Sequence, residues 1–176
     1  MRFSKTDIAD CWLISVEPHL DDRGLFARTY CDREFAQAGI EVKFVQCNTS
    51  YSVKRATLRG MHFQRAPHEE GKLVRCTQGA IFDVILDLRP GSPTFLKWQG
   101  FGLTALNRDA LYLPAGIAHG FQTLSDASEV FYQMTTHYVP EAASGVRWDD
   151  PAFAIRWPLP DPILSDRDRT YPRFSP

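Results

Sequence analysis

The sequence predicts an all-β domain of the jelly-roll class, a double-stranded β-helix with a few short helices. Apolar and polar residues alternate with a period of two through many segments, most clearly over residues 80–88. These segments recur roughly every ten residues, and short turns rich in Gly, Pro, Asn and Asp separate them. Many short strands at such spacing are typical of a sandwich or barrel, and a jelly roll fits this pattern best.

The expected elements follow one another with short connections. In the run 80–88, Phe82, Val84 and Leu86 share one face, whereas Asp83 and Asp87 lie on the other. Taken in chain order, the expected strands cover residues 11–17, 24–31, 43–51, 56–64, 72–78, 80–88, 95–104, 110–114, 119–124, 128–138 and 145–149. One helix is expected over residues 32–38, with Asp32 as its N-cap and Gly39 as its stop.

The pattern changes after Tyr138. Prolines at positions 151, 158 and 160 block regular strand pairing there. The segment is nevertheless too apolar for a disordered tail, because it carries Trp148, Phe153 and Trp157. We therefore expect a single domain over residues 1–176, with the segment 139–176 wrapping back over the barrel.

Composition and charge exclude several classes of function. The 176 residues include 20 Lys and Arg and 21 Asp and Glu, so no basic excess favours nucleic acid or anionic lipid. The N-terminus lacks a signal peptide, and no stretch approaches the roughly 18 apolar residues that span a bilayer. Four widely spaced cysteines without a C-x-x-C pair indicate reduced thiols. We expect a soluble cytoplasmic protein that binds neither nucleic acid nor membrane.

Two histidines lie in strand contexts that suit a site. His62 falls within L-R-G-M-H-F-Q, where Gly60 could mark a bulge that turns Arg59 and His62 to the same side. The turn P-x-G-x-x-H, which ends at His119, is similar to the second signature of cupins. Metal-binding cupins add an upstream H-x-H, but Gln64 stands where the second histidine would be. Two histidines make a poor metal site, so no metal is expected.

Local pattern alone assigns no chemistry to two further residues. On that pattern, Lys72 is interpreted as an ordinary surface lysine. Tyr132 lies on one strand face with Val130 and Met134, where it is either core or a proton donor, because a phenol keeps its proton at neutral pH.

Across nearly its whole length, from residue 21 to residue 168, the chain resembles the dTDP-4-dehydrorhamnose 3,5-epimerase family. The matching blocks, in order, are D-x-R-G, F-V-Q-x-N, L-R-G-M-H-F-Q, G-K-L-V-R, D-x-R-x-G-S-P-T, P-x-G-x-A-H-G-F, Tyr132, W-x-D-P and W-P. The resemblance implies a jelly roll free of metal and cofactor that dimerises by strand exchange. It also implies inversion of one or two carbons beside the ketone of a nucleotide-linked 4-keto-6-deoxyhexose. The lack of a Gly-rich dinucleotide motif or P-loop agrees with chemistry that needs no redox cofactor.

The resemblance also implies roles for single residues. His62 would be the general base, and Asp168 would hold and polarise it. Tyr132 would be the general acid on the opposite face of the sugar, and Lys72 would stabilise the enolate at the ketone oxygen. Asp83, on the polar face of its strand, is a second candidate to support His62.

The expected substrate contacts divide between sugar, diphosphate and nucleotide. Arg59 and His119 would contact diphosphate or sugar. The residues expected on the nucleotide side or elsewhere on the substrate are Arg23, Gln46, Asn48, Arg167, Tyr138 and Arg28.

Three positions depart from the best-known members, where acids stand in place of Arg28, Cys47 and Ala143. We hypothesise that these changes alter the preferred nucleoside or sugar decoration.

Alternative functions remain at this stage. An epimerase acting at one carbon, or a ketoisomerase, would use the same enolate chemistry. A metal-dependent cupin or a non-catalytic binding module fits the residues less well. The product would feed a surface polysaccharide or a decorated small molecule.

Overall fold

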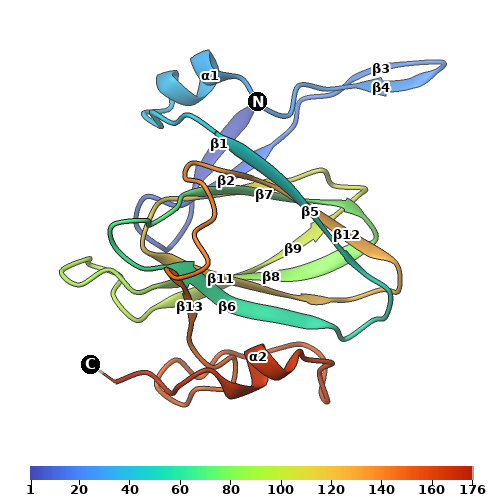
Figure 1. Ribbon diagram of the computed structural model, residues 1–176. Coiled ribbons are helices and arrows are strands. Elements are labelled where there is room, and N and C mark those ends of the chain that lie inside the picture. The colour runs from blue at the N-terminus through green and yellow to red at the C-terminus, as the bar shows by residue number, and fades with distance from the viewer. Residues whose placement is uncertain (176) are drawn as a thin grey trace.

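Two antiparallel sheets face each other in the computed structural model, which describes residues 1–175 (Figure 1). The first sheet has the strand order β1 (Arg2–Lys5), β2 (Trp12–Ser15), β10 (Ala110–Leu113), β7 (Lys72–Gln78), β12 (Ser128–Met134), β5 (Gln46–Ser52). The second has the order β13 (Ala143–Gly145), β6 (Leu58–Gln64), β11 (Ile117–Thr123), β8 (Ala80–Asp87), β9 (Trp98–Thr104). The predicted jelly-roll class is confirmed.

Three elements lie outside the two sheets. The hairpin of β3 (His19–Asp21) and β4 (Gly24–Phe26) projects away from the body, beside helix α1 (Asp32–Gln37) (Figure 1). Helix α2 (Asp166–Thr170) lies at the opposite end, below β6 (Figure 1).

Several predicted boundaries were wrong. The strand expected over 24–31 is only the three residues of β4, and the strand expected over 145–149 is β13, displaced toward the N-terminus. Arg147 and Asp149 pair with each other instead of continuing the strand. The N-cap of α1 is Cys31, not Asp32, whereas Gly39 follows the helix with a φ of +82°, as expected for a stop.

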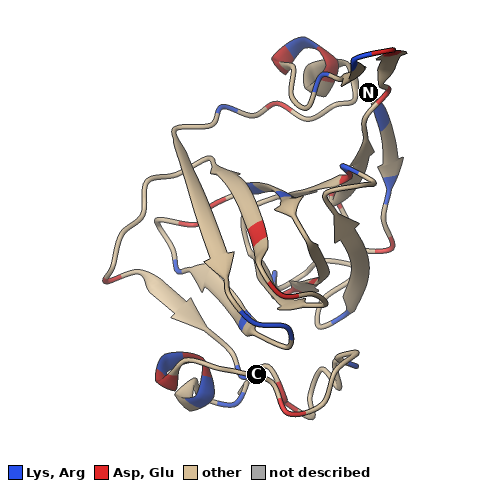
Figure 2. Ribbon diagram, turned by 90° about the vertical axis from the view of Figure 1, so that its right-hand side faces the viewer, with Lys and Arg blue, Asp and Glu red and all other residues tan. Residues whose placement is uncertain are grey.

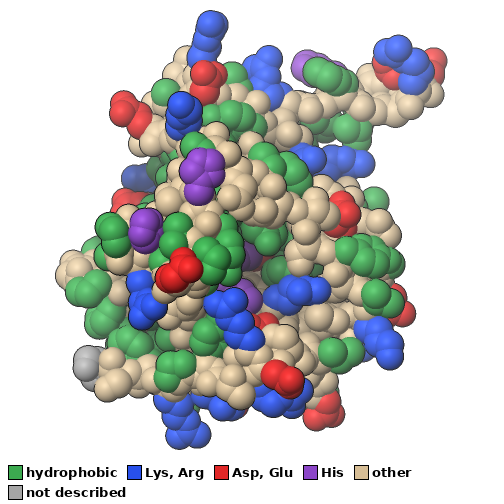
Figure 3. Space-filling model, in the orientation of Figure 1, with side chains coloured by type: hydrophobic (Ala, Val, Ile, Leu, Met, Phe, Trp, Pro, Cys, Tyr) green, Lys and Arg blue, Asp and Glu red, His purple; other side chains and the backbone are tan. Residues whose placement is uncertain are grey.

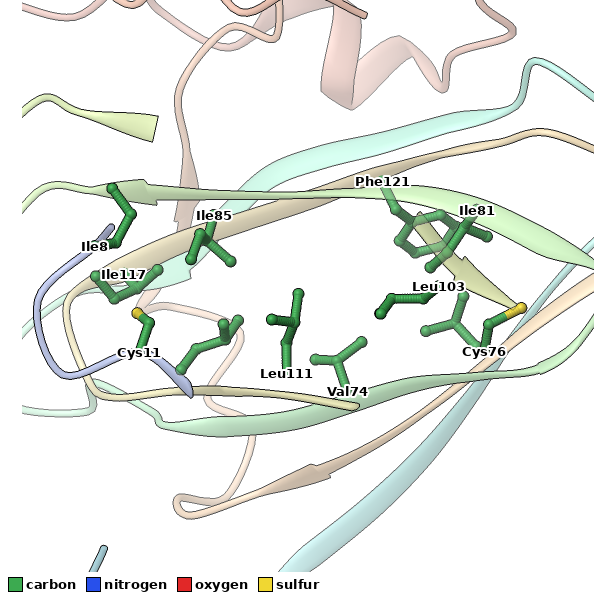
Figure 4. Packing of buried hydrophobic residues seen from close by; sticks show 12 residues of the cluster. Ile8, Cys11, Val74, Cys76, Ile81, Ile85, Leu103, Leu111, Ile117 and Phe121 are labelled. Atoms are coloured by element: carbon green, nitrogen blue, oxygen red, sulfur yellow. The ribbon is translucent and has the colours of Figure 1, made fainter. Parts of the chain in front are cut away.

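The core between the sheets comes from strand faces that point inward. Val74 of β7 and Leu111 of β10 meet Ile85 of β8 from the other sheet (Figure 4). Two of the cysteines, Cys11 and Cys76, belong to this cluster, and all four cysteines are free thiols. Asp83 lies on the same inward face of β8, between the buried Ile81 and Ile85. Its contacts are described with the site below.

The C-terminal segment covers the outer face of the second sheet. Val84 and Leu86, on the outer face of β8, form a second cluster with Val146 and Phe153, and Trp157 packs against it. The Gln122 side chain fixes this segment through two hydrogen bonds to the backbone of Leu159. This route carries α2 back to β6. Residue 176, the last of the expected segment 139–176, lies outside the described residues.

The inward strand faces change from apolar to polar toward one end. Along β12, buried Val130 is followed by Tyr132, and along β7, buried Cys76 and Val74 are preceded by Lys72. The core therefore fills only part of the space between the sheets, and the polar end is left for a cavity.

Charged residues are mixed by sign. Acidic and basic residues alternate in sequence at the start of α1 and along α2, as the red and blue ribbon colours show (Figure 2). None of the helices between residues 1 and 175 is long and apolar enough to cross a membrane.

Candidate active site

A cavity of about 360 Å³ opens at the polar end of the barrel. In the space-filling view, histidine side chains lie in a recess between basic side chains (Figure 3). The predicted site residues that line this cavity are Gln46, Asn48, Arg59, His62, Lys72, His119, Tyr132, Tyr138 and Arg167.

A strand irregularity turns Arg59 and His62 into this cavity together. The pairing of β6 with β11 shifts register, with His119 opposite His62 but Phe121 opposite Arg59. Gly60 sits in the shift with a φ of +145°, and a Cβ there would lie 2.5 Å from the Gly120 Cα. The bulge expected at Gly60 is confirmed.

His62 is held by a carboxylate from the far end of the chain. Its Nε2 lies 2.6 Å from Oδ1 of Asp168, which is buried at the start of α2. The Ser165 hydroxyl caps this helix by accepting a hydrogen bond from the Asp168 backbone N–H. A carboxylate on Nε2 favours the tautomer that carries its proton there, which leaves Nδ1 with a free lone pair. The His62 side chain is 40% exposed, so solvent and ligand can reach it.

Lys72 is buried and held on two sides. Its ammonium lies 3.0 Å from Oε1 of Glu70 and donates a hydrogen bond of 3.3 Å to the His62 backbone carbonyl. A positive charge is therefore fixed next to the strand that carries His62.

Tyr132 approaches the cavity from the other sheet. It lies on β12 of the first sheet, whereas His62 lies on β6 of the second. Burial raises the pKa of the Tyr132 phenol, and the Arg59 guanidinium opposes that change only in part. The phenol therefore keeps its proton at neutral pH.

The sequence had suggested Asp83 as a second candidate to support His62, but in the structure Asp83 contacts a different histidine. Its Oδ2 lies 2.8 Å from Nε2 of His119, which is its diagonal neighbour across the β8–β11 pair, whereas Phe121 is directly opposite. Alternation placed Asp83 on the polar face of its strand, but the pairing of the strands determines which histidine it meets.

Arg23 and Arg28 do not reach the cavity of their own chain. Arg23 is at the tip of the β3–β4 hairpin and pairs with Asp21, and Arg28 pairs with Glu34 of α1. Each guanidinium is therefore bound by a nearby carboxylate of its own chain. Arg28 thus does not line the cavity of its own chain, and its effect on the nucleotide preference stays a prediction.

Of the other two positions that depart from the best-known family members, only one lines the cavity. Cys47 is exposed and does not line the cavity, because alternation along β5 turns Gln46 and Asn48 inward instead. Ala143 does line the cavity.

Sequence reasoning missed two prominent cavity residues, Glu70 and Tyr171. Glu70 could have been found, because residues two apart in an extended chain share a side and Lys72 was already a candidate. Tyr171, whose ring lies 5.8 Å from that of His62, follows α2 and has no local pattern that marks it.

Metal coordination has no obvious place in the described part of the chain. No three or more His, Cys, Asp and Glu side chains within residues 1–175 are grouped to hold an ion.

Fold and site together define a cupin-like isomerase. Residues 5–176 match the model of a family described as dTDP-4-dehydrorhamnose 3,5-epimerase, and the chain belongs to this family. A relative of that name from Methanothermobacter thermautotrophicus is 46% identical over 173 residues, 97% of this chain and 92% of the relative.

Solved structures agree with this assignment. The dTDP-4-dehydrorhamnose 3,5-epimerase of Bacillus anthracis, with TDP and PPi bound, has a TM-score of 0.96 and 43% identity, covering 98% of this chain and 99% of that one. ChmJ, a 3'-monoepimerase from Streptomyces bikiniensis in complex with dTDP-quinovose, has a TM-score of 0.89 and 34% identity, covering 96% of this chain and 85% of that one.

Proposed function

We propose that this protein inverts C3 and C5 of a dTDP-linked 4-keto-6-deoxyhexose, with dTDP-4-keto-6-deoxyglucose as substrate. The observation that carries the proposal is the His62–Asp168 contact of 2.6 Å, in a cavity that Tyr132 and Lys72 also line. The family assignment and the relatives' names support this choice of reaction and nucleotide.

The first step removes a proton from a carbon beside the ketone. The C–H electron pair moves into the carbon–carbon bond and the carbonyl π electrons move onto oxygen, which forms an enolate. His62 accepts the proton at Nδ1, and Asp168 stabilises the resulting imidazolium. Lys72 stabilises the negative oxygen, because a buried ammonium held in a fixed position interacts strongly with developing charge.

The second step returns a proton to the other face of the same carbon. Tyr132 donates its phenolic proton, and the enolate collapses to the ketone with the configuration inverted. Its position on the sheet opposite His62 supports this division of roles. Exchange of protons with solvent restores both groups, and the same pair then acts on the second carbon.

The diphosphate has matching positive charge. Arg59 and Arg167 form no ion pair with any carboxylate in residues 1–175, since Arg59 bonds Ser52 and the Tyr51 carbonyl and Arg167 lies over the Tyr171 ring. Guanidinium groups free of carboxylates suit phosphate oxygens. His119, held by Asp83, supplies a further donor toward diphosphate or sugar. We assign Gln46, Asn48 and Tyr138 to the nucleotide side of the cavity.

The projecting hairpin supports a homodimer. Leu20 is 76% exposed and Phe26 is 75% exposed, and both lie on β3–β4. Apolar side chains so exposed gain from covering by a second copy, and that copy would receive Arg23 from the tip of the same hairpin.

The free thiols agree with a reducing compartment, so we place the reaction in the cytoplasm. An activated deoxysugar is a building block for carbohydrate chains, which gives the protein a place in polysaccharide or other carbohydrate biosynthesis.

Proton NMR of dTDP-4-keto-6-deoxyglucose in heavy water tests the proposal. Incubation with the protein should remove the C3 and C5 proton signals and produce a new set of sugar resonances. Persistence of both signals would contradict the proposed reaction.

The second candidate is inversion at a single carbon. ChmJ, which is named a 3'-monoepimerase, shares this fold over 96% of the chain. Loss of one proton signal with retention of the other would select this alternative.

A further inference from the structure

We propose that Glu70 is a positioning residue that holds Lys72 so that one ammonium N–H is left for the ketone oxygen. This inference rests on the proposed function, in which Lys72 stabilises the enolate. Glu70 itself acts through Lys72.

The pairing of the two side chains follows from the chain geometry. Glu70 comes two residues before Lys72, the first residue of β7, so both side chains turn to the same side. Their charged atoms lie 3.0 Å apart, and the side chains are only 4% and 7% exposed. Both line the cavity.

The contacts of the Lys72 ammonium limit where its N–H groups can point. A lysine ammonium has three N–H donors. One is donated to the His62 backbone carbonyl at 3.3 Å, and the Glu70 carboxylate lies 3.0 Å from the same nitrogen as an ion pair. Together the carbonyl and the carboxylate hold the ammonium beside the residue that removes the proton, where a further N–H is left for the ketone oxygen.

Charge compensation for Lys72 comes from Glu70. The cross-strand neighbours of Lys72 are Leu113 of β10 and Met134 of β12, which carry no charge. A buried ammonium without a partner is costly, so a carboxylate at 3.0 Å keeps it both charged and in place. The other titratable or charged groups facing the same cavity are Arg59 and His62 of β6, His119 of β11, Tyr132 of β12, Tyr138, and Arg167 and Tyr171 of the C-terminal segment.

Little competes with Lys72 for this carboxylate. The second oxygen, Oε2 of Glu70, is buried and has no hydrogen-bond partner in the described chain. Glu70 is therefore committed to Lys72 and has no other bonding role to lose in a substitution.

The kinetic test compares Glu70→Gln with Glu69→Gln, which removes the same charge from the exposed neighbouring residue outside this cavity. Glu70→Gln should slow deuterium exchange at the sugar carbons on the order of 100-fold, the effect of misplacing a reacting group by about an ångström. Glu69→Gln should exchange at the wild-type rate. The dissociation constant for dTDP should stay unchanged in both variants, because neither residue is assigned to nucleotide or diphosphate.

A double-mutant cycle separates positioning from general destabilisation. In a Lys72→Met background there is no ammonium that Glu70→Gln could leave without a partner. Glu70→Gln should then lower the exchange rate by no more than about twofold further. A further loss similar to that seen with Lys72 present would overturn the proposal, because Glu70 would then act without Lys72.

An NMR measurement without substrate tests the same point. In lysine-labelled protein, the two Hε protons of an immobilised Lys72 should have separate shifts, and Lys72→Met identifies the signal by its loss. Glu70→Gln should merge the two shifts. A merged signal in the wild type, or separate shifts in Glu70→Gln, would overturn the proposal. If the wild type catalyses no exchange, the proposed function fails, and the NMR result alone decides whether Glu70 holds Lys72.

Discussion

At the scale of single residues, each side chain proposed to handle a proton or the enolate oxygen is matched to its task by its surroundings. His62 is partly exposed yet held by a buried carboxylate, so it can exchange protons with solvent between turnovers. Tyr132 is partly buried and has no carboxylate partner within residues 1–175, and its raised pKa means that it keeps its proton until the carbanion forms. Lys72 is buried together with its carboxylate partner, Glu70. Base, acid and oxyanion stabiliser thus differ in environment as much as in residue type.

Asp168→Asn should lower the epimerisation rate on the order of 10³–10⁴-fold, because an amide no longer selects the tautomer or stabilises the imidazolium. The rate of product formation by NMR measures this. Asp166→Asn serves as control, since Asp166 is exposed on the same short helix and makes no side-chain contact with His62. Equal losses in the two variants would show that the helix, and not the dyad, had been damaged.

Sequence alone could find His62 but not its partner. The motif around His62 marks a strand histidine, whereas Asp168 follows 106 residues later on a short helix. The resemblance was needed to suggest Asp168, and Asp83, on the polar face of its strand, was only a second candidate. The pairing of β8 with β11 puts His119 opposite Ile85 and diagonal to Asp83, and this places the Asp83 carboxylate against His119.

At the scale of elements, a buried acid joins the end of β8 to the turn after it and to the N-terminal segment. The Asp87 carboxylate accepts hydrogen bonds from Arg89, Ser92 and Thr94. Arg89 in turn donates to the Ala9 carbonyl. Burial by itself would raise the pKa of Asp87, but these hydrogen bonds outweigh it and lower the pKa well below its ordinary value. The D-x-R-x-G-S-P-T motif is thus a structural clamp.

Asp87→Asn should lower the free energy of unfolding by about 3 kcal/mol at neutral pH, because it leaves Arg89 without its buried partner. Since the folded pKa is below the unfolded one, the contribution of Asp87 is present above the ordinary value of 3.8 and is lost as the pH falls below it. Urea unfolding from about pH 6 to about pH 3 should show the gap between wild type and variant beginning to narrow below the ordinary pKa. A gap that stays constant would contradict the clamp.

Strand boundaries were predicted correctly where apolar and polar residues alternate strongly. They were wrong where the pairing partner determines where a strand begins and ends. The strand expected over 72–78 matches β7, and the run 80–88 matches β8 to within one residue. β13 was displaced because its limits depend on pairing with β6, which the local sequence does not encode. Residues 27–31 leave the hairpin toward α1 instead of extending β4.

At the scale of the whole molecule, the β3–β4 hairpin bears on two predicted contacts that do not line the cavity of their own chain. A resemblance assigns Arg23 and Arg28 to a substrate without saying which chain delivers them. In one chain both arginines bind neighbouring carboxylates instead. The proposed dimer would deliver Arg23 to a second copy, because the hairpin projects away from the two sheets of its own chain (Figure 1).

Phe26→Asp should weaken dimerisation at least about 10-fold, because a charge would replace an apolar side chain in the contact. Sedimentation velocity over a range of concentrations measures the change. Leu106→Asp is the matched control, since Leu106 is 84% exposed but lies in the connection between β9 and β10, away from the hairpin. Equal behaviour of both variants would mean that the hairpin does not form the dimer.

The placement of base and acid on opposite sheets is the central claim, and deuterium exchange with Tyr132→Phe tests it most directly. In heavy water, His62 should still remove the proton and return deuterium to the same face. Proton NMR of dTDP-4-keto-6-deoxyglucose should then show the C3 or C5 signal disappearing while the sugar keeps its starting configuration. His62→Asn should show neither exchange nor inversion. Inversion by Tyr132→Phe at the wild-type rate would contradict the account, because the second proton would then come from another group.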